Sequence, residues 1–269
     1  MSLEVLSPPR ARDASVKAAL LFLEPSGRKP QLGFTYDDAQ ADVSEIYSPH
    51  TVLIGDLRPG APTLDIEGFA LARQISAVAD FYDDDVVAGL GRAEAADLVA
   101  DLTGATHVHV FDHTRRKRAA DAARQPSTRA HVDYTAASAP RRLRDLIGDP
   151  DLLTRPFAFI NVWRPIRHPA QDWPLALCDA RSVTPGDLVA TDIIYPDRRG
   201  EIYGLTYNPR QCWWYAPDMA LDEALLIKCY DSRPDVARFT PHTAFEHPRT
   251  PPGAPPRESI EFRTIAFFG

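Results

Sequence analysis

The stretch FAFINVWR, residues 157–164, consists almost entirely of aromatic, β-branched and other apolar side chains, and a proline stands on either side of it. Such a short apolar run between turn residues is typical of a buried β-strand. Nine further runs of this kind lie between residue 106 and the C-terminus, at residues 106–112, 129–134, 175–178, 187–195, 200–207, 213–216, 224–230, 239–245 and 258–268. Ten short strands with few helices between them predict a mainly β fold, a sandwich or barrel with peripheral helices.

Three segments have helical patterns, at residues 66–81, at residues 94–102 before Gly104, and at residues 139–147. The first 65 residues are rich in proline and are predicted to be irregular. We expect residues 1–65 to form an N-terminal extension that packs on the core, and residues 66–269 to form the main body of what is a single domain overall.

The composition limits the class of protein. Of 269 residues, 44% are hydrophobic and 25% are charged, as in an ordinary soluble globular protein. The formal net charge of −7 argues against a nucleic-acid or anionic-membrane partner, which would require clustered Lys and Arg. Three widely spaced cysteines favour no disulfide framework, and neither a targeting segment nor a membrane span is recognisable, so a cytoplasmic location is expected. The sequence gives no indication of oligomeric state.

The triplet His131-Val132-Asp133 lies in one of the predicted strands. Residues i and i+2 of a strand point to the same face, so this imidazole and carboxylate could bind one metal ion. His242, in the predicted strand at 239–245, is the candidate third ligand. Two histidines and one carboxylate leave three positions open, as in non-haem Fe(II) oxygenases. By composition about one His-x-acid triplet is expected by chance, so the triplet alone is weak support.

The segment RESIEFR, residues 257–263, alternates between polar and apolar side chains. Arg257, Ser259, Glu261 and Arg263 would lie on one face of a strand. A guanidinium with a hydroxyl two residues further on can bind a carboxylate. If this strand lies beside the strand of His242, Arg257 and Ser259 would hold the far carboxylate of 2-oxoglutarate, with Arg263 as the alternative anchor. An Arg–Glu ladder on an exposed sheet face is the other interpretation.

Two further residues are candidates for lining the pocket. Asn161 alternates inward with Phe157 and Phe159 on the predicted strand at 157–164, and Tyr207 stands near an aromatic run. Packing in the core is the alternative role for both.

Longer strings of residues also match a known family. They are GF at 68–69, DFYDDD at 80–85, FDHT at 111–114, HVDYT at 131–135, NVWRP at 161–165, DWPLALCD at 172–179, YPD at 195–197, DEALLIKCYDS at 222–232, PHTAF at 241–245 and PRESIE at 256–261. Through them the chain resembles the hydroxylase/desaturase family of fungal and bacterial secondary metabolism, over nearly all of its length after residue 65.

The resemblance implies a double-stranded β-helix, or jelly-roll, core and an Fe(II)- and 2-oxoglutarate-dependent oxygenase that uses O₂ on a small natural product. It implies that His131, Asp133 and His242 bind iron, and that Arg257 with Ser259 anchors the cosubstrate. Hydroxylation, desaturation and ring formation all stay open. Two other functions are considered: a cupin-type metal-dependent dioxygenase without 2-oxoglutarate, and a non-catalytic jelly-roll that binds a ligand or assists a partner enzyme.

Overall fold

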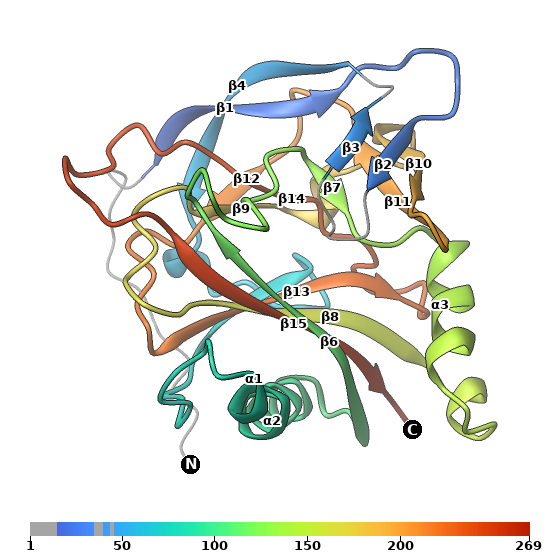
Figure 1. The fold of residues 1–269 in the computed structure, drawn as a ribbon. Helices are drawn as coiled ribbons and strands as arrows, with labels where there is room; N and C mark the ends of the chain where they lie inside the picture. The colour runs from blue at the N-terminus through green and yellow to red at the C-terminus, as the bar shows by residue number, and fades with distance from the viewer. Residues whose placement is uncertain (1–14, 35–39, 44–45) are drawn as a thin grey trace.

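Two β-sheets face each other in the computed structural model, which describes residues 15–34, 40–43 and 46–269 (Figure 1). The larger sheet contains, in spatial order, β1 (Val16–Leu23), β4 (Tyr47–Asp56), β12 (Trp213–Tyr215), β9 (Leu175–Cys178), β14 (His242–Ala244), β7 (His131–Val132), β11 (Arg199–Leu205), β10 (Leu188–Ile194), β2 (Gln31–Phe34) and β3 (Gln40–Val43). The smaller sheet contains β5 (Phe69–Arg73), β13 (Glu223–Asp231), β8 (Phe157–Pro165), β15 (Glu258–Phe267) and β6 (His107–Lys117).

Strand β8 shows why the sequence forms two apolar layers. Every residue of β8 is buried. Phe159 and Trp163 point into the core between the sheets, whereas Ile160 and Val162 belong to a second cluster that packs against a helix on the far side. A strand covered on both faces is expected to be a continuous apolar run instead of an alternating one. The FAFINVWR stretch is such a strand.

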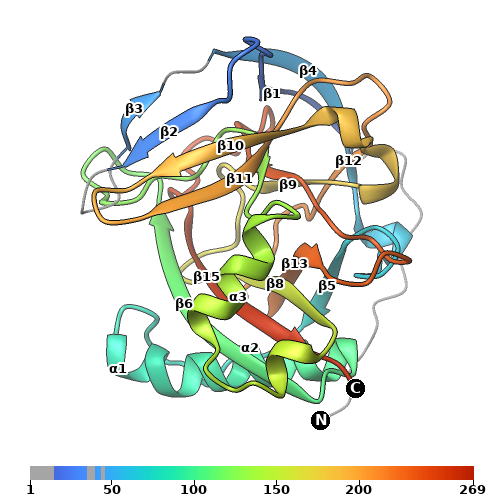
Figure 2. The ribbon, with the colours of Figure 1, turned by 90° about the vertical axis from the view of Figure 1, so that its right-hand side faces the viewer.

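The helices lie outside the two sheets. The short α1 (Asp84–Val86), a π-helical turn at Val87–Gly91 and α2 (Arg92–Thr103) cover the outer face of the smaller sheet (Figure 1). Helix α3 (Ser138–Leu146) lies across one end of the space between the sheets (Figure 2).

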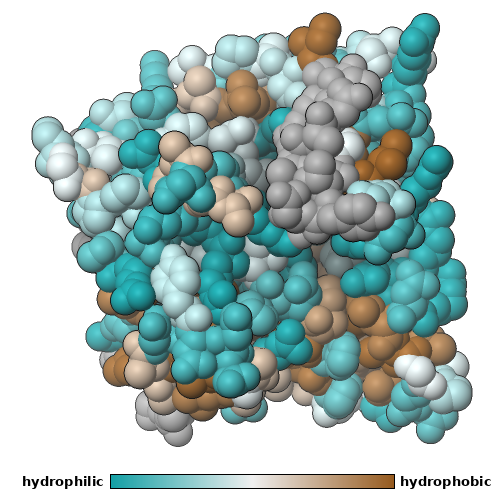
Figure 3. Space-filling model, viewed as in Figure 1, coloured by the Kyte–Doolittle hydropathy of each residue, from teal (hydrophilic) through white to brown (hydrophobic). Residues whose placement is uncertain are grey.

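No helix in the described segments has the length and apolar composition needed to cross a bilayer. The face in Figure 3 is largely hydrophilic, and its hydrophobic residues gather along the lower part of the view, including the lower right.

The N-terminus of α3 is held by two reciprocal hydrogen bonds. The backbone N–H of Ser138 donates to Thr135 Oγ1 over 2.9 Å, and the backbone N–H of Thr135 donates to Ser138 Oγ over 2.8 Å. On the inner side of this helix, Ala139 and Leu143 join the core between the sheets. Helix α3 thus begins a few residues after the segment that carries His131 and Asp133.

Most of the expected elements are confirmed. Each of the ten predicted strands corresponds to one strand of the structure, and the helices predicted at 94–102 and 139–147 are α2 and α3. The mainly β class with peripheral helices is therefore correct.

Two expectations are wrong. The helix predicted at 66–81 is absent, because residues of this segment form β5, which pairs antiparallel with β13. Gly68 has a φ of 90°, which ends any helical path just before that strand. The described part of the first 65 residues is also not irregular, because β1 to β4 belong to the larger sheet; residues 1–14, 35–39 and 44–45 lie outside the described residues. The division of the chain at residue 65 stays a prediction.

Candidate metal and cosubstrate site

Three candidate metal ligands meet in the middle of the larger sheet. His131 on β7 and His242 on β14 are directly paired in the antiparallel ladder. Asp133 follows β7, and its Oδ1 lies 3.4 Å from His131 Nε2 and 3.9 Å from His242 Nε2. One ligand atom from each residue lies within 4.8 Å of the others. The structure thus brings together the three residues that the sequence analysis grouped.

Hydrogen bonds fix which nitrogen of each imidazole carries its proton. His131 Nδ1 lies 2.7 Å from the carbonyl oxygen of Arg129, and His242 Nδ1 lies 3.1 Å from that of Thr240. A carbonyl oxygen only accepts, so each Nδ1 donates and each neutral ring presents a lone pair at Nε2. Two lone pairs and a carboxylate oxygen then converge, which is repulsive until a cation binds between them. This donor set fits Fe(II).

The pKa values favour the metal-binding protonation states. Burial raises the pKa of Asp133, but neighbouring His131, His242 and Arg263 outweigh it and hold that pKa well below its usual range. Burial, together with the nearby His131, lowers the pKa of His242. At neutral pH the carboxylate is therefore ionised and His242 is neutral, as metal ligands must be.

Residues of the smaller sheet contact the other oxygen of Asp133. Asn161 Nδ2 on β8 donates to Asp133 Oδ2 over 2.7 Å, while Cys229 Sγ and Arg263 Nε lie 3.9 Å and 4.0 Å away. Cys229 falls where the register of β13 against β8 shifts, an irregularity that can re-aim a side chain. Burial and the charge of Asp133 raise the pKa of the Cys229 thiol well above its ordinary value, so the thiol stays protonated.

Arg257 and Ser259 form a buried pair of hydrogen-bond donors at the start of β15. Arg257 is 3% exposed, its Nη1 donates to the carbonyl oxygen of Trp173 over 2.7 Å, and its guanidinium lies 5.3 Å from the ring centroid of Trp163. Among the described residues, neither Arg257 Nε nor Ser259 Oγ has a hydrogen-bond partner. Buried donors without acceptors are rare and costly, and a carboxylate would satisfy both.

Electrostatics distinguish Arg257 from Arg263. Burial and nearby Arg116 lower the pKa of Arg257 to about 9, which still leaves the side chain cationic at neutral pH. Arg263 has its charge balanced, since it pairs with Asp112 at 2.7 Å and with Glu261 at 3.4 Å. No salt bridge to Arg257 is present within the described ranges. Of these two arginines, Arg257 is therefore the one without an ion pair among the described residues.

A single cavity joins the candidate metal ligands to the arginines. Its lining includes His131, Asp133, His242, Arg257, Arg263, Trp163, Leu175, Thr243, Ser127, Arg116 and Glu261. The condition considered for the cradle, that the RESIEFR strand lies beside the strand of His242, is not met. Instead, β15 lies between β8 and β6 in the smaller sheet, and its side chains reach the cavity from the opposite side.

The two candidate pocket residues have different positions. Asn161 reaches the site through Asp133. Tyr207 does not, because it stacks on His50 with ring centroids 4.0 Å apart, beside Phe22. Cys229 was not among the sequence candidates, since a strand irregularity of this kind depends on pairing between distant segments and leaves no local signal.

Comparisons with known proteins agree with this arrangement. The family described as "Oxidoreductase/YMDC permease-like domain" matches residues 20–267. The Fe(II)/2-oxoglutarate-dependent dioxygenase nvfI of Aspergillus novofumigatus is 32% identical, with 94% of this chain and 97% of the relative covered. The hydroxylase/desaturase efuI of Hormonema carpetanum is 33% identical, with 82% and 85% covered.

A solved structure is similar over nearly the full length. The iron and alpha-ketoglutarate-dependent endoperoxidase NvfI superimposes with a TM-score of 0.87 at 31% identity, covering 96% of this chain and 99% of that one. The expected jelly-roll core is confirmed by this likeness, together with the two facing sheets.

Proposed function

Because this chain belongs to the hydroxylase/desaturase family of Fe(II)/2-oxoglutarate-dependent oxygenases, we propose that it hydroxylates or desaturates a small natural product. The observation that carries the proposal is the convergence of two imidazole Nε2 atoms and one carboxylate oxygen at His131, Asp133 and His242. Relatives named as a dioxygenase and as hydroxylase/desaturases support this class of reaction.

In this proposal His131, Asp133 and His242 hold Fe(II). With 2-oxoglutarate and O₂, that metal supplies the oxidising chemistry for an unactivated C–H bond. The protein contributes the donor atoms, and the carbonyl oxygens of Arg129 and Thr240 keep both Nε2 lone pairs available.

Arg257 and Ser259 are proposed to bind the far carboxylate of 2-oxoglutarate. Support comes from the buried Arg257 Nε and Ser259 Oγ, which have no acceptor among the described residues. Trp163 and Leu175 form an apolar wall of the same cavity. Because this wall excludes water, a guanidinium–carboxylate pair there is stronger than it would be in solvent. Arg263 is not proposed as the carboxylate anchor, because Asp112 and Glu261 already balance its charge. Its Nε lies near Asp133 instead.

The remaining proposals concern partners and location. A net charge of −7 supports a small molecule as the substrate, with neither nucleic acid nor a membrane surface as partner. Cys178, Cys212 and Cys229 are all free, which supports a reducing, cytoplasmic location.

The test is to add Fe(II) to the purified protein without oxygen and to record the visible spectrum with and without 2-oxoglutarate. We expect an absorption band only when both are present, no band for His131→Ala, and succinate formation once O₂ and substrate are added. Iron binding without the band would favour a cupin-type dioxygenase that does not use 2-oxoglutarate. Failure to bind iron would favour a non-catalytic protein.

A further inference from the structure

We infer that Asn161 is a positioning residue that restricts Asp133 to binding the metal through one oxygen. The inference rests on the proposed function, since it concerns the metal ligand Asp133. Asn161 itself has no role assigned by the proposed function, and it belongs to the sheet opposite the ligands.

The two oxygens of Asp133 face different partners. Oδ1 lies toward the imidazoles, 3.4 Å and 3.9 Å from the Nε2 atoms of His131 and His242. Oδ2 is turned toward the smaller sheet, where Asn161 Nδ2 donates to it over 2.7 Å. An ionised carboxylate only accepts hydrogen bonds, so the amide nitrogen of Asn161, and not its oxygen, must face Oδ2.

Asn161 dominates the surroundings of Oδ2. Its two other neighbours make weaker contacts: the Cys229 thiol, a weak donor, lies 3.9 Å away, and Arg263 Nε lies 4.0 Å away, at the outer limit of an ion pair. Asn161 is 1% exposed, so little solvent competes for its amide. The hydrogen bond is therefore the main directional restraint on this oxygen.

The backbone of Asn161 is also firmly placed. It lies in β8, the central strand of the smaller sheet, and pairs with Arg263 of β15 on one side and with Ile227 of β13 on the other. A donor fixed in this way holds the Asp133 carboxylate in one orientation, with Oδ2 toward Asn161 and Oδ1 toward the imidazoles.

The restraint has a consequence for the number of open positions. A facial triad of three single donor atoms leaves three positions for cosubstrate and O₂. If Asp133 used both oxygens it would occupy one of these positions. To do so it would have to turn Oδ2 away from Asn161 and leave a buried amide donor without an acceptor. Asn161 thereby keeps the position available.

The experiment compares Asn161→Leu with wild type, because leucine has nearly the same shape and cannot donate a hydrogen bond. Thr264→Val is the matched control. It removes a buried 2.7 Å hydrogen bond from Thr264 Oγ1 to the carbonyl oxygen of Ile160 on the same strand β8, without a contact to Asp133. Co(II) is titrated into the metal-free full-length proteins, and both the affinity and the visible absorption of bound Co(II) are recorded.

Asn161→Leu should weaken Co(II) binding by about 10- to 100-fold and change the intensity of the Co(II) bands, which depends on coordination number. Thr264→Val should stay within about two-fold of wild type, with an unchanged spectrum. Equal affinity and identical spectra for Asn161→Leu and wild type would overturn the inference. Absence of Co(II) binding by wild type would instead contradict the proposed function.

If Asn161→Leu does not fold, Asn161→Ser gives the same test, because its hydroxyl is too short to reach Oδ2. It should reproduce the weakened binding and altered spectrum, and wild-type values would overturn the inference.

Discussion

His131 and His242 are direct partners in the β7–β14 ladder, with ring centroids 4.6 Å apart, although strands β8 to β13 separate them in the sequence. The candidate metal site therefore depends on the pairing of two very short strands in the centre of the larger sheet. Asp133 joins them only because it follows β7 directly.

Replacing His242 with alanine should abolish stoichiometric iron binding and reduce succinate formation by at least about 100-fold, because one of three donor atoms is lost. Bound iron and succinate are measured in the same preparation. His113→Ala, on β6 and away from the triad, is the control and should retain both. Full iron occupancy in His242→Ala would contradict the ligand assignment.

Arg257→Gln should raise the KM for 2-oxoglutarate by roughly 30- to 150-fold, since a charge-assisted contact is worth about 2–3 kcal/mol. Initial rates at varied 2-oxoglutarate give this value. Arg118→Gln is a matched control, because Arg118 pairs with Asp172 nearby but is half-exposed. A larger rise in KM for Arg263→Gln than for Arg257→Gln would make Arg263 the anchor.

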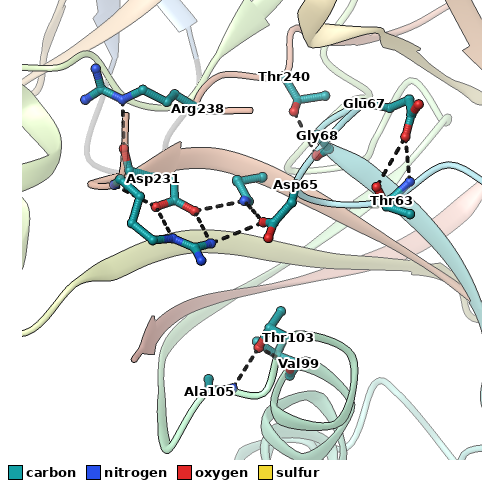
Figure 4. A network of polar contacts seen from close by, with 12 residues as sticks. Thr63, Asp65, Glu67, Gly68, Val99, Thr103, Ala105, Asp231, Arg238 and Thr240 are labelled. Atoms are coloured by element: carbon teal, nitrogen blue, oxygen red, sulfur yellow. Dashed lines mark hydrogen bonds and ion pairs between the residues drawn. The ribbon is translucent and has the colours of Figure 1, made fainter. Parts of the chain in front are cut away.

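Gly68→Ala should damage the metal site from a distance. Gly68 has a φ of 90°, and an added Cβ would lie 2.2 Å from Thr240 Oγ1, which donates to the carbonyl oxygen of Gly68 (Figure 4). Thr240 also provides the carbonyl oxygen that orients His242. We expect a loss of more than about 2 kcal/mol in the free energy of unfolding and weaker metal binding.

Gly104→Ala is the control for this change. Gly104 has a φ of 70°, but nothing lies within 4 Å of an added Cβ. The free energy of unfolding of Gly104→Ala should fall by about 1 kcal/mol because of backbone strain, and its metal affinity should equal that of wild type. Equal metal affinity in the two variants, from parallel titrations, would show that Thr240 does not transmit the effect.

Asp231→Asn should destabilise the fold by about 3–5 kcal/mol, because it leaves the buried Lys228 ammonium without its buried counter-ion (Figure 4). Asp65→Asn, which removes the partly exposed second partner of Lys228, should cost less than about 1 kcal/mol. Urea unfolding measures both. If both variants lowered the free energy of unfolding by a similar amount, burial would not be what determines the contribution of each Lys228 ion pair.

Local patterns were sufficient for most of the fold. The strands were predictable because buried apolar runs such as β8 end at turn residues, and the proximity of His131 to Asp133 follows from the two-residue repeat of a strand. Ala and Leu in the FALA sequence of the 66–81 segment favour a helix, whereas the pairing of this segment with β13 is a non-local interaction that local patterns do not reveal. The first strand, β1, does alternate in burial, so a signal was present there.

The site was less predictable than the fold. The sequence groups Arg257 with Ser259 but does not show that β15 faces the candidate metal ligands from the opposite sheet. Nor does it show that Tyr207 stacks on His50, outside the cavity. Both facts depend on which strands become neighbours, and strand order is set by the packing of the whole chain.

The site consists of two incomplete halves. The larger sheet carries the atoms proposed to hold iron, whereas the smaller sheet carries Arg257, Ser259 and Asn161. Under the proposed function, a chain whose sheets have not docked therefore lacks the proposed cosubstrate anchor beside the candidate metal ligands. Docking of the two sheets is then the step that completes the proposed oxygenase site.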